Sequence, residues 1–239
     1  KGVQVAHSGE MITPTASKTD CSNRIRQSVH LPSLTASDLA IPFSEGTTAN
    51  VIEIIPNQLT TNRVIETVDV MEGKFIPNIH QDQLKLAVIE RHHHKHTIGL
   101  GIVKGFGIQS GAVATTIAHD SHNAIVLGTN DEDMIVALEK LQSMQGGLVV
   151  VDRGKILASL ALPIGGLMTE SPTKQAVNDL HKLHQALHTI HPTLDYHLML
   201  TLSFLSLPVI TSLKLTDTGL FDVTSFKHIP VEHTEKAGQ

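Results

Sequence analysis

The segment that most limits how this chain can fold is LKLAVIERH, at residues 84–92. A nearly continuous apolar run of strand length is typical of a strand buried on both faces at the centre of a sheet. Further segments of strand-like character lie at residues 49–55, 61–70, 111–118, 124–129, 147–152 and 155–162. We therefore expect a domain built on one large sheet whose centre is covered on both sides.

Two segments have helical periodicity instead. The first covers residues 131–145, with Asn130 as its cap and Gly146 at its end, and it has an apolar stripe formed by Met134, Leu138, Leu141 and Met144. The second covers residues 171–190, with Ser171 as its cap and with an inward face formed by Val177, Leu180, Leu183 and Leu187. Because the helices do not alternate strictly with strands, we expect an α+β or mixed-sheet α/β fold.

The first 46 residues differ from the rest. GVQVA, HSGE and MI predict a strand, a turn and a strand, and SNRIRQSVHL alternates like a further strand. This segment has too few apolar residues to close a core. We therefore expect residues 1–46 to be the tail of a larger β structure and residues 47–239 to form the main domain.

Composition excludes several classes of function. A net charge of -5 and a pI near 6.3 argue against a nucleic-acid partner, which needs clustered Lys and Arg. The longest uncharged apolar stretches, residues 156–168 and 198–210, are well short of the ~20 residues of a membrane span. We expect them to be buried in this domain, against another domain or between subunits, and we expect a homo-oligomer.

Cysteine usage indicates the compartment. Cys21 is the only cysteine, so no internal disulfide can form and a reducing compartment is expected. It has no nearby His that would indicate a nucleophile or a metal ligand. The first residues lack the pattern of a signal peptide. The sequence therefore predicts a cytoplasmic protein.

Two other patterns have ordinary structural explanations. Four glycines in the region 99–107 are spaced 2, 4 and 2, which is not the G-x-G-x-x-G of a dinucleotide loop, so close backbone packing is the better interpretation. His184 and His188 could hold zinc from one helix face, but no third ligand is indicated. We expect a solvated face that includes His181 and His191.

Two polar groups follow predicted strands and are candidates for a site. Glu90, Arg91 and His92 follow the buried strand, either as ligand-binding groups or as a structural ion pair. The run His119, Asp120, Ser121, His122 and Asn123 lies between two strands. Asp, Ser and Asn also form ordinary turns, but two imidazoles beside a carboxylate can converge on a point for proton transfer or metal binding.

Several stretches resemble one enzyme family. VIERH, IGLGIVKGFGI, GAVATTIAHDSHNAIVLGTNDEDM, LPIGGLM and LTLSFLSLPVITSLKLTDTGLFDV are similar to the C-terminal region of bacterial adenine deaminase, an amidohydrolase. The resemblance covers residues 50–231, and residues 1 to about 45 resemble the last strands of the small β domain that flanks the family's barrel. It implies a parent enzyme that hydrolyses adenine to hypoxanthine and ammonia with a divalent metal, manganese or iron or sometimes zinc, in a (β/α)-barrel.

The resemblance also implies how this chain would contribute. The chain lacks the barrel's eight strand–helix units and its ordered metal ligands, so the barrel becomes an expected partner and adenine the expected substrate. His119, Asp120 and His122 would act at the barrel mouth, with Glu90, Arg91, His92, Ser121 and Asn123 binding substrate or supporting the metal site. The alternatives are a structural module in which this run is a turn, and an autonomous hydrolase with metal on His119, Asp120 and His122.

Overall fold

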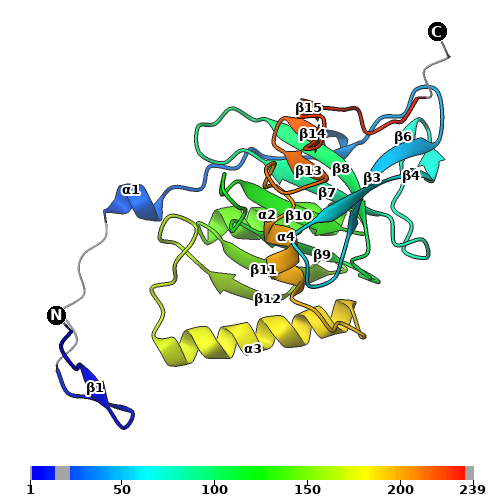
Figure 1. The fold of residues 1–239 in the computed structure, drawn as a ribbon. Helices are drawn as coiled ribbons and strands as arrows, with labels where there is room; N and C mark the ends of the chain where they lie inside the picture. Colours follow the sequence, from blue (N-terminus) through cyan, green and yellow to red (C-terminus); the bar gives the residue numbers. More distant parts are fainter. Residues whose placement is uncertain (1, 14–21, 235–239) are drawn as a thin grey trace.

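The computed structural model describes residues 2–13 and 22–234. Its main element is an open eight-stranded sheet in the order β12-β11-β9-β10-β7-β8-β3-β4 (Figure 1). Neighbouring strands are antiparallel except β3 and β8, which run parallel. The expected mixed-sheet architecture is therefore confirmed. The strands are β3 (Thr48–Ile54), β4 (Thr61–Thr67), β7 (Leu84–Ile89), β8 (Ile98–Lys104), β9 (Ala112–Thr115), β10 (Ala124–Gly128), β11 (Gly147–Asp152) and β12 (Lys155–Ala161).

The remaining elements are short sheets and helices. The small sheets contain β1 (Ala6–His7) and β2 (Glu10–Met11), β5 (Val70–Met71) and β6 (Lys74–Phe75), and β13 (Leu213–Thr216), β14 (Gly219–Asp222) and β15 (Lys227–His228). The helices are α1 (Asn23–Arg26), the 3-10 turn η1 (Ala36–Leu39), α2 (Asp131–Ser143), α3 (Thr173–Ile190) and α4 (Leu198–Ser203). Within residues 2–13 and 22–234, none of these helices has the length and apolar content needed to cross a bilayer.

The large sheet is covered on both faces, as the apolar strand predicted. Successive side chains of β7 point to opposite faces: Leu86 and Val88 join the core beneath α3 and α4, whereas Ala87 and Ile89 join the core beneath α2. All six residues of β7 and all five of β10 are buried. Lys85 is the one charged residue in β7, and its ammonium pairs with Asp131 at the start of α2.

Helix α2 forms where its capping residues predict it. Asn130 has extended backbone and its side chain accepts a hydrogen bond from the N–H of Asp133 at 2.8 Å. The helix ends where Gln145 and Gly146 adopt positive φ. Met134, Leu138 and Leu141 are buried.

Helix α3 differs from its prediction in two respects. Its cap is Pro172 without a side-chain hydrogen bond, rather than Ser171. Leu183 and Leu187 are buried, but Val177 and Leu180 are 45% and 40% exposed. Only the C-terminal half of α3 packs on the sheet, so the apolar stripe continues past the surface that covers it.

The apolar segment 198–210 is largely buried, as expected. Leu198, Leu202, Leu205 and Leu207 are all buried, while Leu200 and Val209 are exposed. The residues of this segment that are buried belong mainly to the core under α3 and α4. The segment therefore closes one face of the large sheet within this chain.

The predicted strand at SNRIRQSVHL is wrong. The side chain of Ser22 caps the single turn of α1, and the following residues bond to side chains and loops instead of a neighbouring strand. The N–H of Val29 donates to Oε1 of Gln145, and that of His30 donates to the carbonyl of Arg91. Alternation alone does not make a strand when no ladder partner lies beside it. The predicted turn at HSGE is confirmed, between β1 and β2.

The glycines of β8 and the loop after it allow close packing, as predicted. A Cβ on Gly99 would lie 1.8 Å from the carbonyl oxygen of Thr216, and one on Gly107 would lie 2.8 Å from Nε2 of His191. His191 is therefore buried and not part of a solvated face, which corrects its prediction, and burial lowers its pKa. His181, His184 and His188 are exposed. Cys21 lies outside the described residues.

Replacing Gly99 with Ala should destabilise the fold by about 2 kcal/mol or more, because the new methyl group meets rigid backbone. Gly101→Ala in the same strand is the matched control, since its Cβ would meet only side chains, those of Leu215 at 3.3 Å and Leu220 at 3.8 Å. Urea unfolding of both variants measures the difference. Equal losses of stability would contradict this account of Gly99.

Candidate active-site turn

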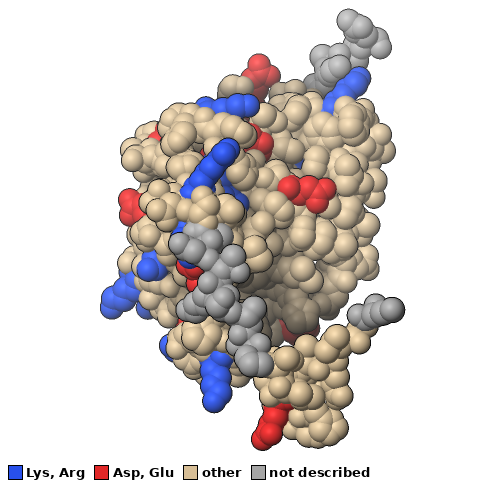
Figure 2. Space-filling view, turned by 90° about the vertical axis from the view of Figure 1, so that its left-hand side faces the viewer, with Lys and Arg blue, Asp and Glu red and all other residues tan. Residues whose placement is uncertain are grey.

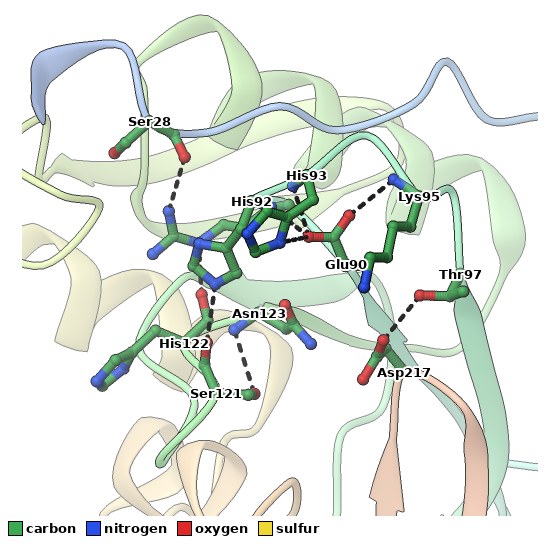
Figure 3. A network of polar contacts seen from close by, with 11 residues as sticks. Ser28, Glu90, His92, His93, Lys95, Thr97, Ser121, His122, Asn123 and Asp217 are labelled. Carbon is green, nitrogen blue, oxygen red and sulfur yellow. Dashed lines mark hydrogen bonds and ion pairs between the residues drawn. The ribbon is translucent and has the colours of Figure 1, made fainter. Parts of the chain in front are cut away.

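The two candidate groups meet where β7 ends and β10 begins, at the ends of two central strands of the large sheet. In the antiparallel register, Ala124 at the start of β10 lies opposite Ile89 at the end of β7. Residues 119–123 precede β10 and residues 90–92 follow β7, so the register brings them together (Figure 3). The 119–123 turn therefore contacts the 90–96 loop. These strand ends lie on the side of α1, which Figure 2 turns toward the viewer and on which uncharged residues predominate.

His119 is held by the end of α4. Its ring stacks on Phe204 with centroids 4.4 Å apart, and its N–H donates to the carbonyl of Ser203 at 2.9 Å. The hydroxyl of Ser206 donates to the His119 carbonyl at 3.2 Å. One imidazole of the turn is thus fixed by packing against a helix that sequence analysis did not connect with it.

Asp120 and Ser121 are exposed at the tip of the turn, and His122 is half-buried. The N–H of His122 closes the turn on the carbonyl of Ala118, and its φ is 51°. Burial lowers the pKa of His122, and His119 and Arg91 lower it further, so its imidazole is neutral at pH 7. The two imidazole centroids are 6.0 Å apart.

Two buried polar atoms of the turn have no hydrogen-bond partner among residues 2–13 and 22–234. They are Nδ1 of His122 and Oδ1 of Asn123, and Asn123 is only 4% exposed. Buried polar atoms in folded proteins are bonded in the great majority of cases. This turn therefore presents one imidazole nitrogen and one amide oxygen whose bonding capacity the described residues do not use.

Arg91 is buried and bonds to three backbone carbonyls. Nε donates to His122, Nη1 donates to Ser28 at 3.2 Å, and Nη2 donates to Gly165 at 3.0 Å. Burial lowers the pKa of Arg91 to about 10, with Glu90 opposing that effect. The guanidinium remains charged at neutral pH. It joins the 119–123 turn to two other segments of the chain.

Glu90 organises its own loop. Its carboxylate accepts hydrogen bonds from the N–H groups of His92, His93 and Lys95 at 2.6, 2.7 and 3.0 Å. Burial raises the pKa of Glu90, but these donors and the His93 ring lower it more, so it lies below the ordinary value of 4.5. The structural interpretation of Glu90 is favoured by these contacts, although its partners are backbone amides and not Arg91.

His92 connects the loop to the turn. Its ring is exposed, and Nε2 donates to the carbonyl of Ser121 at 2.8 Å. Thr97 at the other end of the loop donates to Asp217 at 2.7 Å (Figure 3). The start of the 90–96 loop is therefore attached to the candidate turn through Ser121, and the residue after the loop is attached to Asp217.

The residues that support the turn cannot be recognised from the sequence. Ser28, Gly165 and Phe204 contribute carbonyls or a ring, and a carbonyl acceptor leaves no signature in a sequence. Gly166 could have been noticed in the Gly165-Gly166 pair, because a Cβ there would lie 2.8 Å from Nη2 of Arg91.

The turn does not assemble a metal centre. Among the described residues, no group of three or more His, Cys, Asp or Glu side chains could hold a metal ion. The ring of His119 is stacked on Phe204, and Asp120 is exposed. The donor set proposed from sequence for an autonomous hydrolase does not converge in this structure.

Glu90→Gln should lower the free energy of unfolding at pH 7 by about 2 kcal/mol, because an amide –NH₂ would face a backbone N–H. The depressed pKa means that Glu90 stabilises the wild type above pH 4.5 and that this stability is lost as pH falls below that value. The variant should therefore lose less stability on acidification. Urea unfolding from pH 7 to pH 3 tests this, with exposed Glu45→Gln as the control. Parallel curves for wild type and Glu90→Gln would refute it.

Comparison with known proteins identifies the family. The family model for the adenine deaminase C-terminal domain matches residues 58–227. Adenine deaminase of Lysinibacillus sphaericus is 61% identical over 97% of this chain and 40% of its own length. Those of Geobacillus kaustophilus and Halalkalibacterium halodurans are 47% and 44% identical over 97% and 95% of this chain, or 40% and 39% of their own. The chain thus spans about 40% of these relatives' length, and it belongs to the adenine deaminase family, in which it corresponds to the C-terminal domain.

Proposed function

We propose that this chain is the C-terminal part of an enzyme that hydrolyses adenine to hypoxanthine and ammonia, and that the 119–123 turn contributes to the mouth of its active site. Family membership supports the reaction. Because the matched relatives extend well beyond this region, the activity is proposed for the complete polypeptide. The amidohydrolase barrel and adenine are its proposed partner and substrate.

The observation that carries the role of the turn is its unused bonding capacity. Nδ1 of His122 and Oδ1 of Asn123 are buried and unpaired among the described residues, while Asp120 is exposed next to them. Leaving such atoms unpaired costs free energy. A polar partner that reaches these atoms when the turn opens would satisfy them, and a purine with its ring nitrogens and amino group has the matching chemistry.

The turn could act in proton transfer. Hydrolysis at the purine C6 adds water and releases ammonia, so a proton must reach a ring nitrogen and the departing amine. His122 is neutral at pH 7 and can accept a proton, and the carboxylate of Asp120 can orient or receive one. The amide of Asn123 can hold a ring edge in place.

The family's divalent metal, manganese or iron or zinc, does not fit the donors of this turn. The described residues contain no three-donor group, and the His119 ring is held by Phe204. We infer that the metal of the complete enzyme is held by donors outside the described residues. The contribution of this chain is therefore to orient substrate and handle protons.

A structural role for the turn is the second candidate. Arg91 bonds to the His122 carbonyl, His119 stacks on Phe204, and His92 supports Ser121. These contacts would hold an ordinary turn in a non-catalytic module that serves stability or assembly. The two candidates differ in what loss of the Asp120 or His122 side chain does to turnover.

In the complete polypeptide, His122→Ala and Asp120→Ala should each lower kcat/KM for adenine by about 10²-fold or more. Asp120 is exposed, so its replacement should leave Tm nearly unchanged. His181→Ala on an exposed helix face is the control.

The isolated chain should release no ammonia from adenine with manganese or ferrous iron. Full activity of both turn variants would favour the structural module, and sustained turnover by the isolated chain would exclude the need for a barrel.

We further propose a division at residues 46/47, a cytoplasmic location and self-association as a homodimer. The hairpin of β1 and β2 exposes Val3, Val5, Met11 and Ile12 by 52% or more. Large exposed apolar clusters favour association. Light scattering over a hundredfold range of concentration should show a dimer, and a Val5→Ser, Met11→Ser variant should dissociate more readily. A monodisperse monomer throughout would contradict this.

A further inference from the structure

Arg91 connects three segments that lie far apart in the sequence. Its carbonyl partners belong to Ser28, to His122 and to Gly165. Ser28 follows α1, His122 is in the 119–123 turn, and Gly165 is in the turn of residues 164–168 that precedes α3. Each of these segments is irregular, so none has a sheet ladder that would fix its position.

The guanidinium makes these contacts without a carboxylate at hydrogen-bonding distance among the described residues. The Glu90 carboxylate next to it accepts from backbone amides of its own loop. A buried charge with only carbonyl partners is costly, which argues for a geometric task. A planar guanidinium can donate in three directions at once, whereas an ammonium cannot match that fork.

Residues 22–30 and the turn of residues 164–168 also contact each other. The N–H of Gly165 donates to the carbonyl of Ile25 at 3.0 Å, and Arg26 pairs with Glu170. Thr116, which precedes the 119–123 turn, donates to the carbonyl of Gly166 at 2.6 Å. The turn of residues 164–168 thus contacts both residues 22–30 and Thr116, and Arg91 bonds to all three segments. Gly166 leaves the space that the guanidinium occupies.

We propose that Arg91 is a positioning residue that couples the 119–123 turn to residues 22–30 and to the turn of residues 164–168, so that displacement of either segment loosens the candidate active-site turn. Residues 22–30 lie on the N-terminal side of the division proposed at residues 46/47, so Arg91 transmits the position of this segment to the turn. Only the effect on turnover rests on the proposed function; the coupling itself does not.

Hydrogen exchange on the 239-residue chain tests the coupling. Arg91→Met should raise exchange about tenfold in peptides covering residues 22–30, 118–124 and 163–168, with a smaller rise for Arg91→Lys. Peptides from β3 should be unchanged. Arg63→Met is the matched control, because Arg63 bonds Asn50 and Asp222 elsewhere. A rise confined to one of the three segments, or an equal rise in β3, would overturn the proposal.

A second variant covers the case in which Arg91→Met does not fold. Gly166→Ala places a Cβ 2.8 Å from Nη2 and should displace the guanidinium while retaining it. It should raise exchange in residues 118–124, and it should add little to that peptide in the Arg91→Lys background because both act through one group. Additive effects of the two substitutions on that peptide would overturn the coupling.

Kinetics of the complete polypeptide separate positioning from simple stability. At a temperature where both proteins are folded, Arg91→Met should lower kcat for adenine about tenfold or more with a smaller change in KM, and Arg91→Lys should recover part of the loss. Loosened segments with unchanged kcat would overturn the active-site role of the turn but retain the coupling. Unchanged exchange would overturn the coupling whatever the activity.

Discussion

Burial of the central strands on both faces is the constraint on which the rest of this structure depends. Strands β7 and β10 contain only buried residues, so a helical layer is needed on each side of the sheet. Helix α2 supplies one layer and α3 with α4 the other. Even Lys85, the charged residue within β7, is accommodated by pairing with Asp131 at the beginning of α2.

The same strand pair places the candidate site. Since β7 and β10 are antiparallel neighbours, the end of one lies beside the start of the other. Polar residues that would be unacceptable inside the sheet collect where both strands leave it. The 90–96 loop and the 119–123 turn are therefore neighbours because of sheet register, and α4 adds Phe204 from the covering layer.

At these strand ends, the adjacent residues Glu90 and Arg91 have different tasks. Glu90 bonds inward to its own loop, while Arg91 bonds outward to three other segments. Among the described residues, these contacts leave Nδ1 of His122 and Oδ1 of Asn123 without a hydrogen-bond partner. The proposed role of the turn rests on these unpaired atoms and on the rigid contacts around them.

The sequence by itself determined seven of the eight strands of the large sheet, helix α2 with its Asn130 cap, the family and the location of the polar turn, because periodicity, capping and motifs are local properties. It did not predict the glycine-rich strand β8. Only the tertiary structure decided that Arg91 bonds carbonyls, that His191 is buried, that Val177 is exposed and that residues 22–31 form no strand. Those outcomes depend on which distant backbone lies alongside, and a carbonyl, a ladder partner or a covering layer is not written in the residue that needs it.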